Sequence, residues 1–578
     1  MLQCGPPRGR HARSGRGNVC IWDGRLDNRE ELLILLSERD GDEGDLALRL
    51  YETRGAAGLR YLIGDWSLVI WDAETHSVVL ASDYAGVRPL YYSRTDDRLL
   101  WSSSLSHLAE WSGASELDDD YVAGFLTCGL AAGRTPYRRV YPATPGAALR
   151  VTRHRTTTDV FWSLPTVDTC YQGDDYEEEL RRRFREAVAV RLTAEAPAAA
   201  ELSGGLDSSS VVCVAASLIA SRSSPTPKLT TFSYTHDGST DEGYIRLVEQ
   251  SRGLSPIHLD TAEFPFIARE YVGVAAPLFW AARLIEISRQ LAGTGSRTFL
   301  TGQLGDLVMG NWLDDSEQVA DLLEKGHLAA GLREALAWSR SLRVPVYSIL
   351  WRAVRDGLFP GRVSDNLDLL TGAADRELHG DSLTANFRSR ADSFQKSESR
   401  LPDCVRPTRR KRYRALNAIL AARVLQCPEP LLDVSYSHPF AHRPLVEFMM
   451  TLPAEVVCGP GAPRRLMRRA FAGILPDAVI RRRSKATYNA VFSRALAPLV
   501  TELLEPRQTI QLVERGYLDG QCLRQRLLRF NHGLECNHQQ LRLVILLEFW
   551  LRNREGGIRR PVSAAPFSHS MASIAAST

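Results

Sequence analysis

The sequence predicts two consecutive domains: a sheet-rich α+β domain, then an α/β domain with a parallel, doubly wound sheet and a largely helical C-terminal part. Three observations support this fold class. The length of 578 residues exceeds one ordinary domain several times. Short β-branched and aromatic runs fill the first part of the chain, and helices alternate with strands after it.

The N-terminal domain is expected over residues 19–165, after a disordered lead-in at residues 1–18 that is rich in Gly, Pro and Arg. The runs Tyr61–Asp72 (YLIGDWSLVIWD) and Ser77–Asp83 (SVVLASD) are separated by a polar turn, which is typical of paired strands.

The second domain is expected over residues 170–555, followed by a disordered Ser- and Ala-rich tail at residues 556–578. Residues 177–192 carry apolar side chains at helical spacing behind a cluster of acids, which indicates the start of an amphipathic helix. Strands are predicted at Ala198–Leu202 and Lys228–Thr235, with a small apolar helix between them, as in a parallel sheet.

Composition excludes several classes of protein. The formal net charge is only +3, so charge does not predict binding to nucleic acid. The chain lacks an uninterrupted apolar run of membrane-spanning length, so no membrane association is expected. Ten cysteines without a C-x-x-C pair fit a reducing cytoplasm. Only five of the 71 Lys and Arg residues are lysines, so each lysine is a candidate for a required role.

The segment Ser203–Ser210 (SGGLDSSS) joins a predicted strand to a predicted helix and predicts a phosphate-binding loop. Adjacent glycines admit an anion close to the backbone, and the helix N-terminus offers free N–H groups. The loop is not of the Walker type, because it lacks the G-K-[ST] ending. A second strand-end loop within Phe299–Gly310 (FLTGQLGDLVMG) places Asp306 where it could share one magnesium ion with Asp207.

The segment Ser203–Ser208 resembles the pyrophosphate loop of ATP pyrophosphatases. Together with GDWSLVIWD, SDYAGVRPLYY, TDE, LTGQLGD and HPFAHRPLVEF in this order, it resembles the asparagine synthetase superfamily, which includes β-lactam synthetases and lasso-peptide macrocyclases. The resemblance spans about residues 19–553. It implies a degenerate Ntn-hydrolase-like glutaminase domain followed by an ATP-pyrophosphatase domain of the adenine nucleotide alpha hydrolase type.

The resemblance also implies roles for individual residues. Lys485 matches the superfamily's catalytic lysine, Asp207 and Asp306 match its Mg²⁺ ligands, and Arg481–Arg483 are candidates for gripping phosphates or peptide. The residues implied to bind ATP are Leu202, Ser203, Gly204, Gly205, Leu206, Asp207, Ser208, Ser209, Tyr234, Thr301 and Gly302.

Glutamine hydrolysis is expected to be lost. The superfamily's glutaminases use a cysteine directly after the initiator methionine, where this chain has Leu2, and Cys4 would need processing to become terminal. The Asn-Gly-Glu segment that binds glutamine appears as Asp23, Gly24 and Arg25, so a cation replaces the carboxylate. The domain is expected to survive as a scaffold.

The general base stays unassigned. Gln303 stands where relatives carry Glu or Tyr, and Ser435 stands where a Glu is expected, so the β-lactam-type dyad is missing. His438, His442 and Asp433 are the candidates, with a structural role favoured for the histidines and deprotonation by solvent or substrate as the alternative.

The stretch from His438 to Lys485 is most similar to lasso-peptide macrocyclases. The resemblance implies an ATP- and Mg²⁺-dependent ligase that adenylates an Asp or Glu side chain of a ribosomal peptide and joins it to the peptide's N-terminal amine. Implied partners are a leader-containing precursor peptide, a leader-binding recognition element and a leader protease. The alternatives are an asparagine synthetase, another AMP-forming amide ligase such as a β-lactam synthetase, and an inactive nucleotide-binding scaffold.

Overall fold

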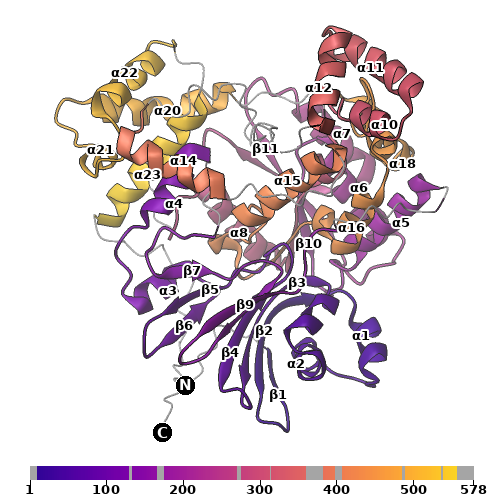
Figure 1. Cartoon of the computed structure of the whole chain (residues 1–578), viewed down its shortest axis with the longest axis vertical. Coiled ribbons are helices and arrows are strands. Elements are labelled where there is room, and N and C mark those ends of the chain that lie inside the picture. The colour runs from indigo at the N-terminus through magenta and orange to yellow at the C-terminus, as the bar shows by residue number, and fades with distance from the viewer. Residues whose placement is uncertain are drawn as a thin grey trace.

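The computed structural model describes residues 10–128, 133–165, 173, 175–269, 275–312, 314–358, 382–397, 407–483, 489–534 and 538–555. Two sheet-based domains follow one another, as the sequence predicts, with helices above them (Figure 1). Among the described residues, no helix combines the length and apolarity needed to cross a bilayer. The tail expected at residues 556–578 lies outside the described residues.

The N-terminal domain stacks two antiparallel sheets, ordered β1-β2-β3-β4-β8-β9 and β6-β5-β7. Apolar side chains such as Val69, Leu80 and Leu90 fill the space between them. The elements are β1 (Arg10–Arg13), β2 (Val19–Leu26), α1 (Arg29–Leu36), α2 (Glu43–Arg54), η1 (Ala56–Tyr61), β3 (Gly64–Asp72), β4 (Ser77–Ser82), β5 (Tyr91–Arg94), β6 (Leu99–Ser102), α3 (Leu105–Ser112), α4 (Asp119–Cys128), β7 (Val140–Pro142), β8 (Ala147–Val151) and β9 (Thr156–Val160).

Residues 10–18 of the lead-in, which was expected to be disordered, are ordered, so the expectation is wrong for these residues. Arg10–Arg13 forms β1, which pairs with β2 in the register Arg10 to Trp22 and Arg13 to Val19. Ladder hydrogen bonds and the burial of Ala12 outweigh the polar composition that suggested disorder.

The second domain is built on a parallel sheet ordered β12-β11-β10-β13-β14. One face packs against α5, α6 and α7, and the other packs against α8. The elements up to the last strand are α5 (Tyr176–Ala189), β10 (Ala198–Glu201), α6 (Leu206–Ala220), β11 (Leu229–Thr235), α7 (Glu242–Arg252), β12 (Ser255–Asp260), α8 (Ala281–Thr294), β13 (Thr298–Leu300), α9 (Gly305–Val308), α10 (Gln318–Glu324), α11 (Leu328–Leu342), α12 (Val346–Leu358), α14 (Ala385–Ser397), α15 (Pro407–Ala422), η5 (Glu429–Leu431) and β14 (Ser435–Ser437).

The C-terminal part is helical, as predicted, and forms a separate lobe. Its helices α20, α22 and α23 pack with α14 and also with α4 of the N-terminal domain, so the two domains share one apolar cluster (Figure 1). The remaining elements are η6 (Pro439–Ala441), α16 (Arg443–Thr451), α17 (Ala454–Val457), α18 (Arg465–Ala470), α19 (Asp477–Arg481), α20 (Asn489–Leu504), α21 (Gln511–Glu514), α22 (Gly520–Asn531) and α23 (His538–Glu555).

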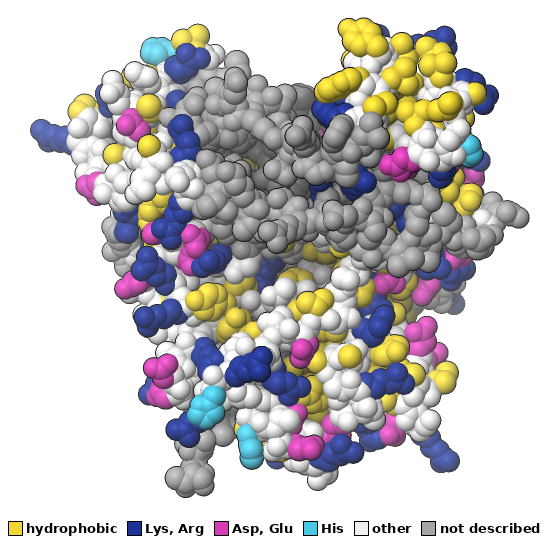
Figure 2. All heavy atoms as spheres, in the orientation of Figure 1, with side chains coloured by type: hydrophobic (Ala, Val, Ile, Leu, Met, Phe, Trp, Pro, Cys, Tyr) yellow, Lys and Arg dark blue, Asp and Glu magenta, His cyan; other side chains and the backbone are white. Residues whose placement is uncertain are grey.

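A second lobe, formed by α10, α11 and α12, carries an exposed apolar surface. Figure 2 shows hydrophobic side chains gathered over these helices. The most exposed of them are Leu328, Leu332, Tyr347 and Trp351.

Candidate active site

The predicted phosphate loop follows the central strand of the parallel sheet. β10 pairs with β11 on one side and β13 on the other, and the loop Leu202–Gly205 leads from its carboxyl end into α6. This is the edge where ligands bind in open parallel sheets. The N–H of Leu202 donates to the carbonyl of Phe232 on β11, which fixes the start of the loop.

Short contacts fix the conformation of the phosphate loop. Gly204 has a φ of +67°, and an added Cβ would lie 2.9 Å from the Cβ of Tyr244, so only glycine fits. The hydroxyl of Ser208 lies 3.0 Å from both the backbone nitrogen and the hydroxyl oxygen of Ser203. Ser209, also predicted to bind ATP, is completely buried in the first turn of α6.

The second predicted loop lies directly against the first. An added Cβ on Gly302 would approach the backbone nitrogen of Ser208 to 2.7 Å, and one on Gly305 would approach the carboxyl carbon of Asp207 to 2.5 Å. The structure therefore brings together the two strand-end loops that the sequence singles out, with both glycines required by the close approach.

The two predicted magnesium ligands meet at one arginine that the sequence analysis did not single out. Nη1 of Arg464 lies 2.5 Å from Oδ1 of Asp207, and its Nη2 is ion-paired with Oδ1 of Asp306. The nearly fully buried guanidinium lies between the two carboxylates, where a metal ion bound by both would lie. Asp207 and Asp306 thus fit a role in holding Mg²⁺ through hard oxygen atoms. Within the described ranges, no cluster of three or more metal-binding side chains occurs.

Arg482 holds the phosphate loop from outside. It donates a hydrogen bond of 3.0 Å to the carbonyl of Gly204, forms an ion pair with Asp241, and lies over the ring of Tyr244 at 4.1 Å. This member of the predicted Arg481–Arg483 run therefore supports the loop backbone. Arg481 instead forms an exposed pair with Asp477.

Lys485 lies outside the described residues, which resume at residue 489. Arg482, three positions before it, is anchored at Gly204.

Tyr234, predicted to contact adenine, belongs to a partly buried polar group at the end of β11. Its hydroxyl interacts electrostatically with Glu201, and Arg283 lies 3.7 Å from the ring centroids of both Tyr234 and Trp280. Burial raises the pKa of Glu201, although Arg283 opposes the shift. Glu201 and Arg283 carry no motif, so a signal for them was absent from the sequence.

The residues considered as general base are placed differently. Nε2 of His438 lies 2.8 Å from the carbonyl of Leu425, so it carries the proton, and Nδ1 accepts a hydrogen bond of 2.6 Å from Thr301. His442 is buried with its Nε2 3.6 Å from Asp27. Both histidines are therefore internal structural groups, whereas Asp433 is exposed.

Gln303 and Ser435 occupy the positions expected for the catalytic dyad of β-lactam synthetases. Nε2 of Gln303 donates a hydrogen bond of 3.1 Å to the hydroxyl of Tyr436, and Ser435 begins β14. Neither side chain is a proton acceptor of useful basicity, so the described residues around the two loops leave the base unassigned.

Ion pairs fill the segment Asp23–Arg25, which resembles the family's glutamine-binding segment. Arg25 pairs with Asp27 at 2.6 Å and with Asp65 at 2.9 Å, and Asp23 pairs with Arg88 at 3.0 Å. Gly24 faces the carbonyl of Asp65 so closely that a Cβ would lie 2.2 Å from it. Cys4 lies outside the described residues.

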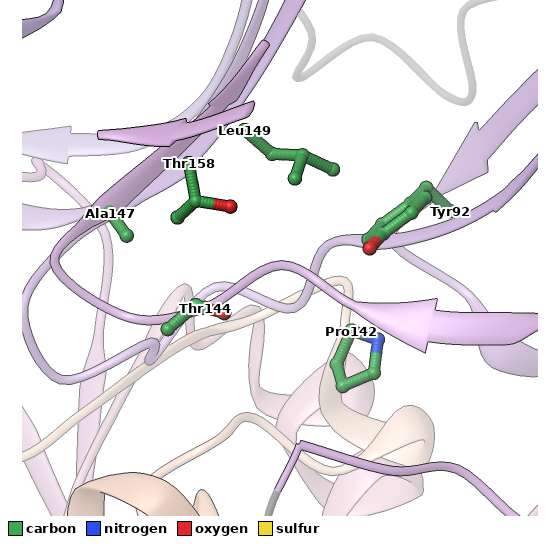
Figure 3. Close-up of a pocket in the computed structure, with 6 residues that line it drawn as sticks. All are labelled: Tyr92, Pro142, Thr144, Ala147, Leu149 and Thr158. Carbon is green, nitrogen blue, oxygen red and sulfur yellow. The ribbon is translucent and has the colours of Figure 1, made fainter. Parts of the chain in front are cut away.

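A small pocket elsewhere in the N-terminal domain does not compete with this site. It lies between the two antiparallel sheets (Figure 3) and has no charged side chain in its lining. The residues that line it are Tyr92, Pro142, Thr144, Ala147, Leu149 and Thr158.

Comparisons with known proteins agree with this architecture. The asparagine synthase family matches residues 179–552, and a glutamine amidotransferase domain matches residues 31–162. Asparagine synthetase [glutamine-hydrolyzing] 3 of Bacillus subtilis is 21% identical over 86% of this chain and 81% of its own. A PRPP amidotransferase structure from B. subtilis is 15% identical, covers 50% of this chain and 72% of that one, and has a TM-score of 0.21.

Shorter matches also occur. Amidase chyE of Penicillium rubens is 30% identical over 35% of this chain, and a putative asparagine synthetase of Methanocaldococcus jannaschii is 26% identical over 40%. This chain covers only 32% and 45% of those two relatives. The match to residues 179–552 spans more than half of the sequence, and the loops at Ser203 and Thr301 lie within it. The chain therefore belongs to the asparagine synthase family, with a glutamine amidotransferase domain in front of its synthase domain.

Proposed function

We propose that the protein is an ATP-dependent carbon–nitrogen ligase that closes a macrolactam in a ribosomal peptide, as lasso-peptide macrocyclases do. The observation that carries this proposal is Arg25, which lies in the segment that resembles the family's glutamine-binding segment and forms ion pairs with Asp27 and Asp65. A synthetase without ammonia from glutamine needs another amine, and a peptide substrate brings its own.

The proposed reaction has two steps. A side-chain carboxylate of the peptide attacks the α-phosphorus of ATP, forming an acyl-adenylate and releasing pyrophosphate. The peptide's N-terminal amine then attacks the acyl carbon, loses a proton and expels AMP. Holding the amine close to the acyl carbon supplies most of the acceleration.

The residues of the two loops suit the first step. Gly204 and the N-terminus of α6 present N–H groups to phosphate oxygens, and Asp207 and Asp306 would hold Mg²⁺, which neutralises phosphate charge when bound. Lys485 is assigned to the developing negative charge. The anchoring of Arg482 at Gly204 supports this assignment, because it ties the chain near Lys485 to the phosphate loop.

A second candidate is an asparagine synthetase that uses free ammonia. The relative of B. subtilis that matches 86% of this chain is named an asparagine synthetase, which supports the synthetase part of this alternative; that relative is named as glutamine-hydrolyzing, so the use of free ammonia rests on Arg25 alone.

The macrocyclase also requires partners: a leader-containing precursor, a leader-binding recognition element and a leader protease.

Mass spectrometry of a candidate leader-containing precursor peptide tests the proposal. We expect a core peptide lighter by one water, with AMP and pyrophosphate, after incubation with the protease, the recognition element, ATP and Mg²⁺. Lys485→Ala should lower the rate by about 10²-fold or more, whereas Lys228→Ala, at an exposed position, should not change it. AMP formation that requires aspartate and ammonia would instead identify the second candidate.

A further inference from the structure

A buried group of charges joins the two domains. Arg25 on β2 pairs with Asp27 and Asp65 of its own domain, and its Nη1 donates to the hydroxyl of Ser437 in the second domain at 3.4 Å. The exposed side-chain fraction is 15% for Arg25 and 7% for Asp65.

A second cation, from the other domain, completes the group. Nε of Arg191 donates to the hydroxyl of Ser437 at 2.8 Å, and its Nη2 lies 3.5 Å from Oδ1 of Asp65. The Ser437 hydroxyl in turn donates to Asp65. The charges of two arginines and two carboxylates balance. The arginines keep the pKa of Asp65 below its usual value despite burial.

Ser437 links this group to the second strand-end loop, which begins at Thr301. It ends β14, pairs with Leu300 on β13, and accepts a hydrogen bond of 3.1 Å from the N–H of Thr301 through its carbonyl. The next residue, His438, accepts from the Thr301 hydroxyl at 2.6 Å. The first residue of the second loop is thus held by two neighbours, one of which is bonded to both arginines.

We propose that Arg25 is a positioning residue for the ATP site: through Asp65 and Ser437 it fixes Thr301 and the loop that follows. Arg25 thereby gives the N-terminal domain a role at the ATP site of the second domain. This role rests on the proposed assignment of the two loops to ATP, and it is independent of which amine or acid is joined.

The physical basis is charge balance. Without the Arg25 guanidinium, Asp27 and Asp65 face Arg191 alone, and Asp65 draws that arginine and the Ser437 hydroxyl toward itself. The end of β14 then loses its fixed position, and the loop that begins at Thr301 becomes less ordered. Close contact with ATP depends on the order of this loop.

Two readouts on the full-length protein test the proposal: hydrogen exchange of the segment 301–305, which needs no ligand, and calorimetric titration with Mg·ATP. Arg25→Met should speed exchange in this segment and weaken ATP binding by about 10-fold, within the usual range of coupling between sites. Ser437→Ala, which keeps every charge, should act in the same direction, and Arg25→Lys should restore part of the affinity.

Glu429→Ala is the matched control. Glu429 also joins the domains, accepting hydrogen bonds from Ser104 at 2.6 Å and from the N–H of Ser106 at 3.2 Å. Within the described residues, no hydrogen bond links it to Ser437, His438 or Thr301. It should lower stability without changing exchange at 301–305. Unchanged exchange and ATP affinity in both Arg25→Met and Ser437→Ala would overturn the proposal, whereas failed cyclisation with intact ATP coupling would reject only the macrocyclase function.

Discussion

His438 illustrates how single residues couple the sheet to the nucleotide loop. Burial lowers its pKa to about 4, because a neutral imidazole suits its position between the Leu425 carbonyl and the Thr301 hydroxyl. The unfolded chain has the ordinary pKa of about 6.5, so it binds the proton more tightly than the folded protein.

This shift predicts a pH dependence of stability. The contribution of His438 is fully present above about pH 6.5 and is lost as the pH falls toward 4, amounting to at most about 3 kcal/mol. Urea unfolding at pH 7.5 and pH 5 should show the loss, and His438→Gln should show a smaller one. An equal loss in the variant would assign the effect to other groups.

The pair of Asp207 and Arg464 predicts a second residue-level effect. Asp207→Asn leaves the buried Arg464 with one carboxylate fewer, so the free energy of unfolding should fall by about 3 kcal/mol. Asp477→Asn breaks the exposed pair with Arg481 and should cost less than about 1 kcal/mol. Denaturant titration measures both, and similar losses would show that the Arg464 pair contributes no special stability.

At the scale of elements, the two strand-end loops depend on glycine where they touch. Gly302→Ala places a methyl group 2.7 Å from the nitrogen of Ser208, so we expect a loss of about 1–3 kcal/mol and weaker binding of ATP. Gly293→Ala, in α8 with open space around it, should be neutral or slightly stabilising. Thermal unfolding and ATP titration of both variants check this prediction, which fails if the two behave alike.

The elements show what the sequence can predict. Local patterns of apolar residues and glycine predict the strand at Ala198–Leu202, the small apolar helix after the phosphate loop and the apolar strand end before Thr301, and the structure confirms them as β10, α6 and β13. Helix α6 begins at Leu206, inside the segment Ser203–Ser210, which the sequence predicts as a loop. The Arg464 bridge and the Glu201–Tyr234 pair unite residues far apart in sequence or without a motif. Local periodicity carries no information on such contacts, so they required the structure.

At the scale of the whole molecule, the two domains are not independent units. Helix α4 lies within the apolar cluster of the C-terminal helices, and the charges around Arg25 cross the same boundary. We therefore expect one cooperative calorimetric transition. Two separable transitions, one for each domain, would contradict this expectation.

The balanced charges around Ser437 also limit how the family's domains can be recombined. Arg25, Asp27 and Asp65 come from one domain, whereas Arg191 and Ser437 come from the other. A chimera that joins this synthase domain to an amidotransferase domain with glutamate at position 25 and acids at positions 27 and 65 would bury three acids beside the single Arg191. A domain exchange that preserves the charge balance would therefore have to transfer all of these residues together.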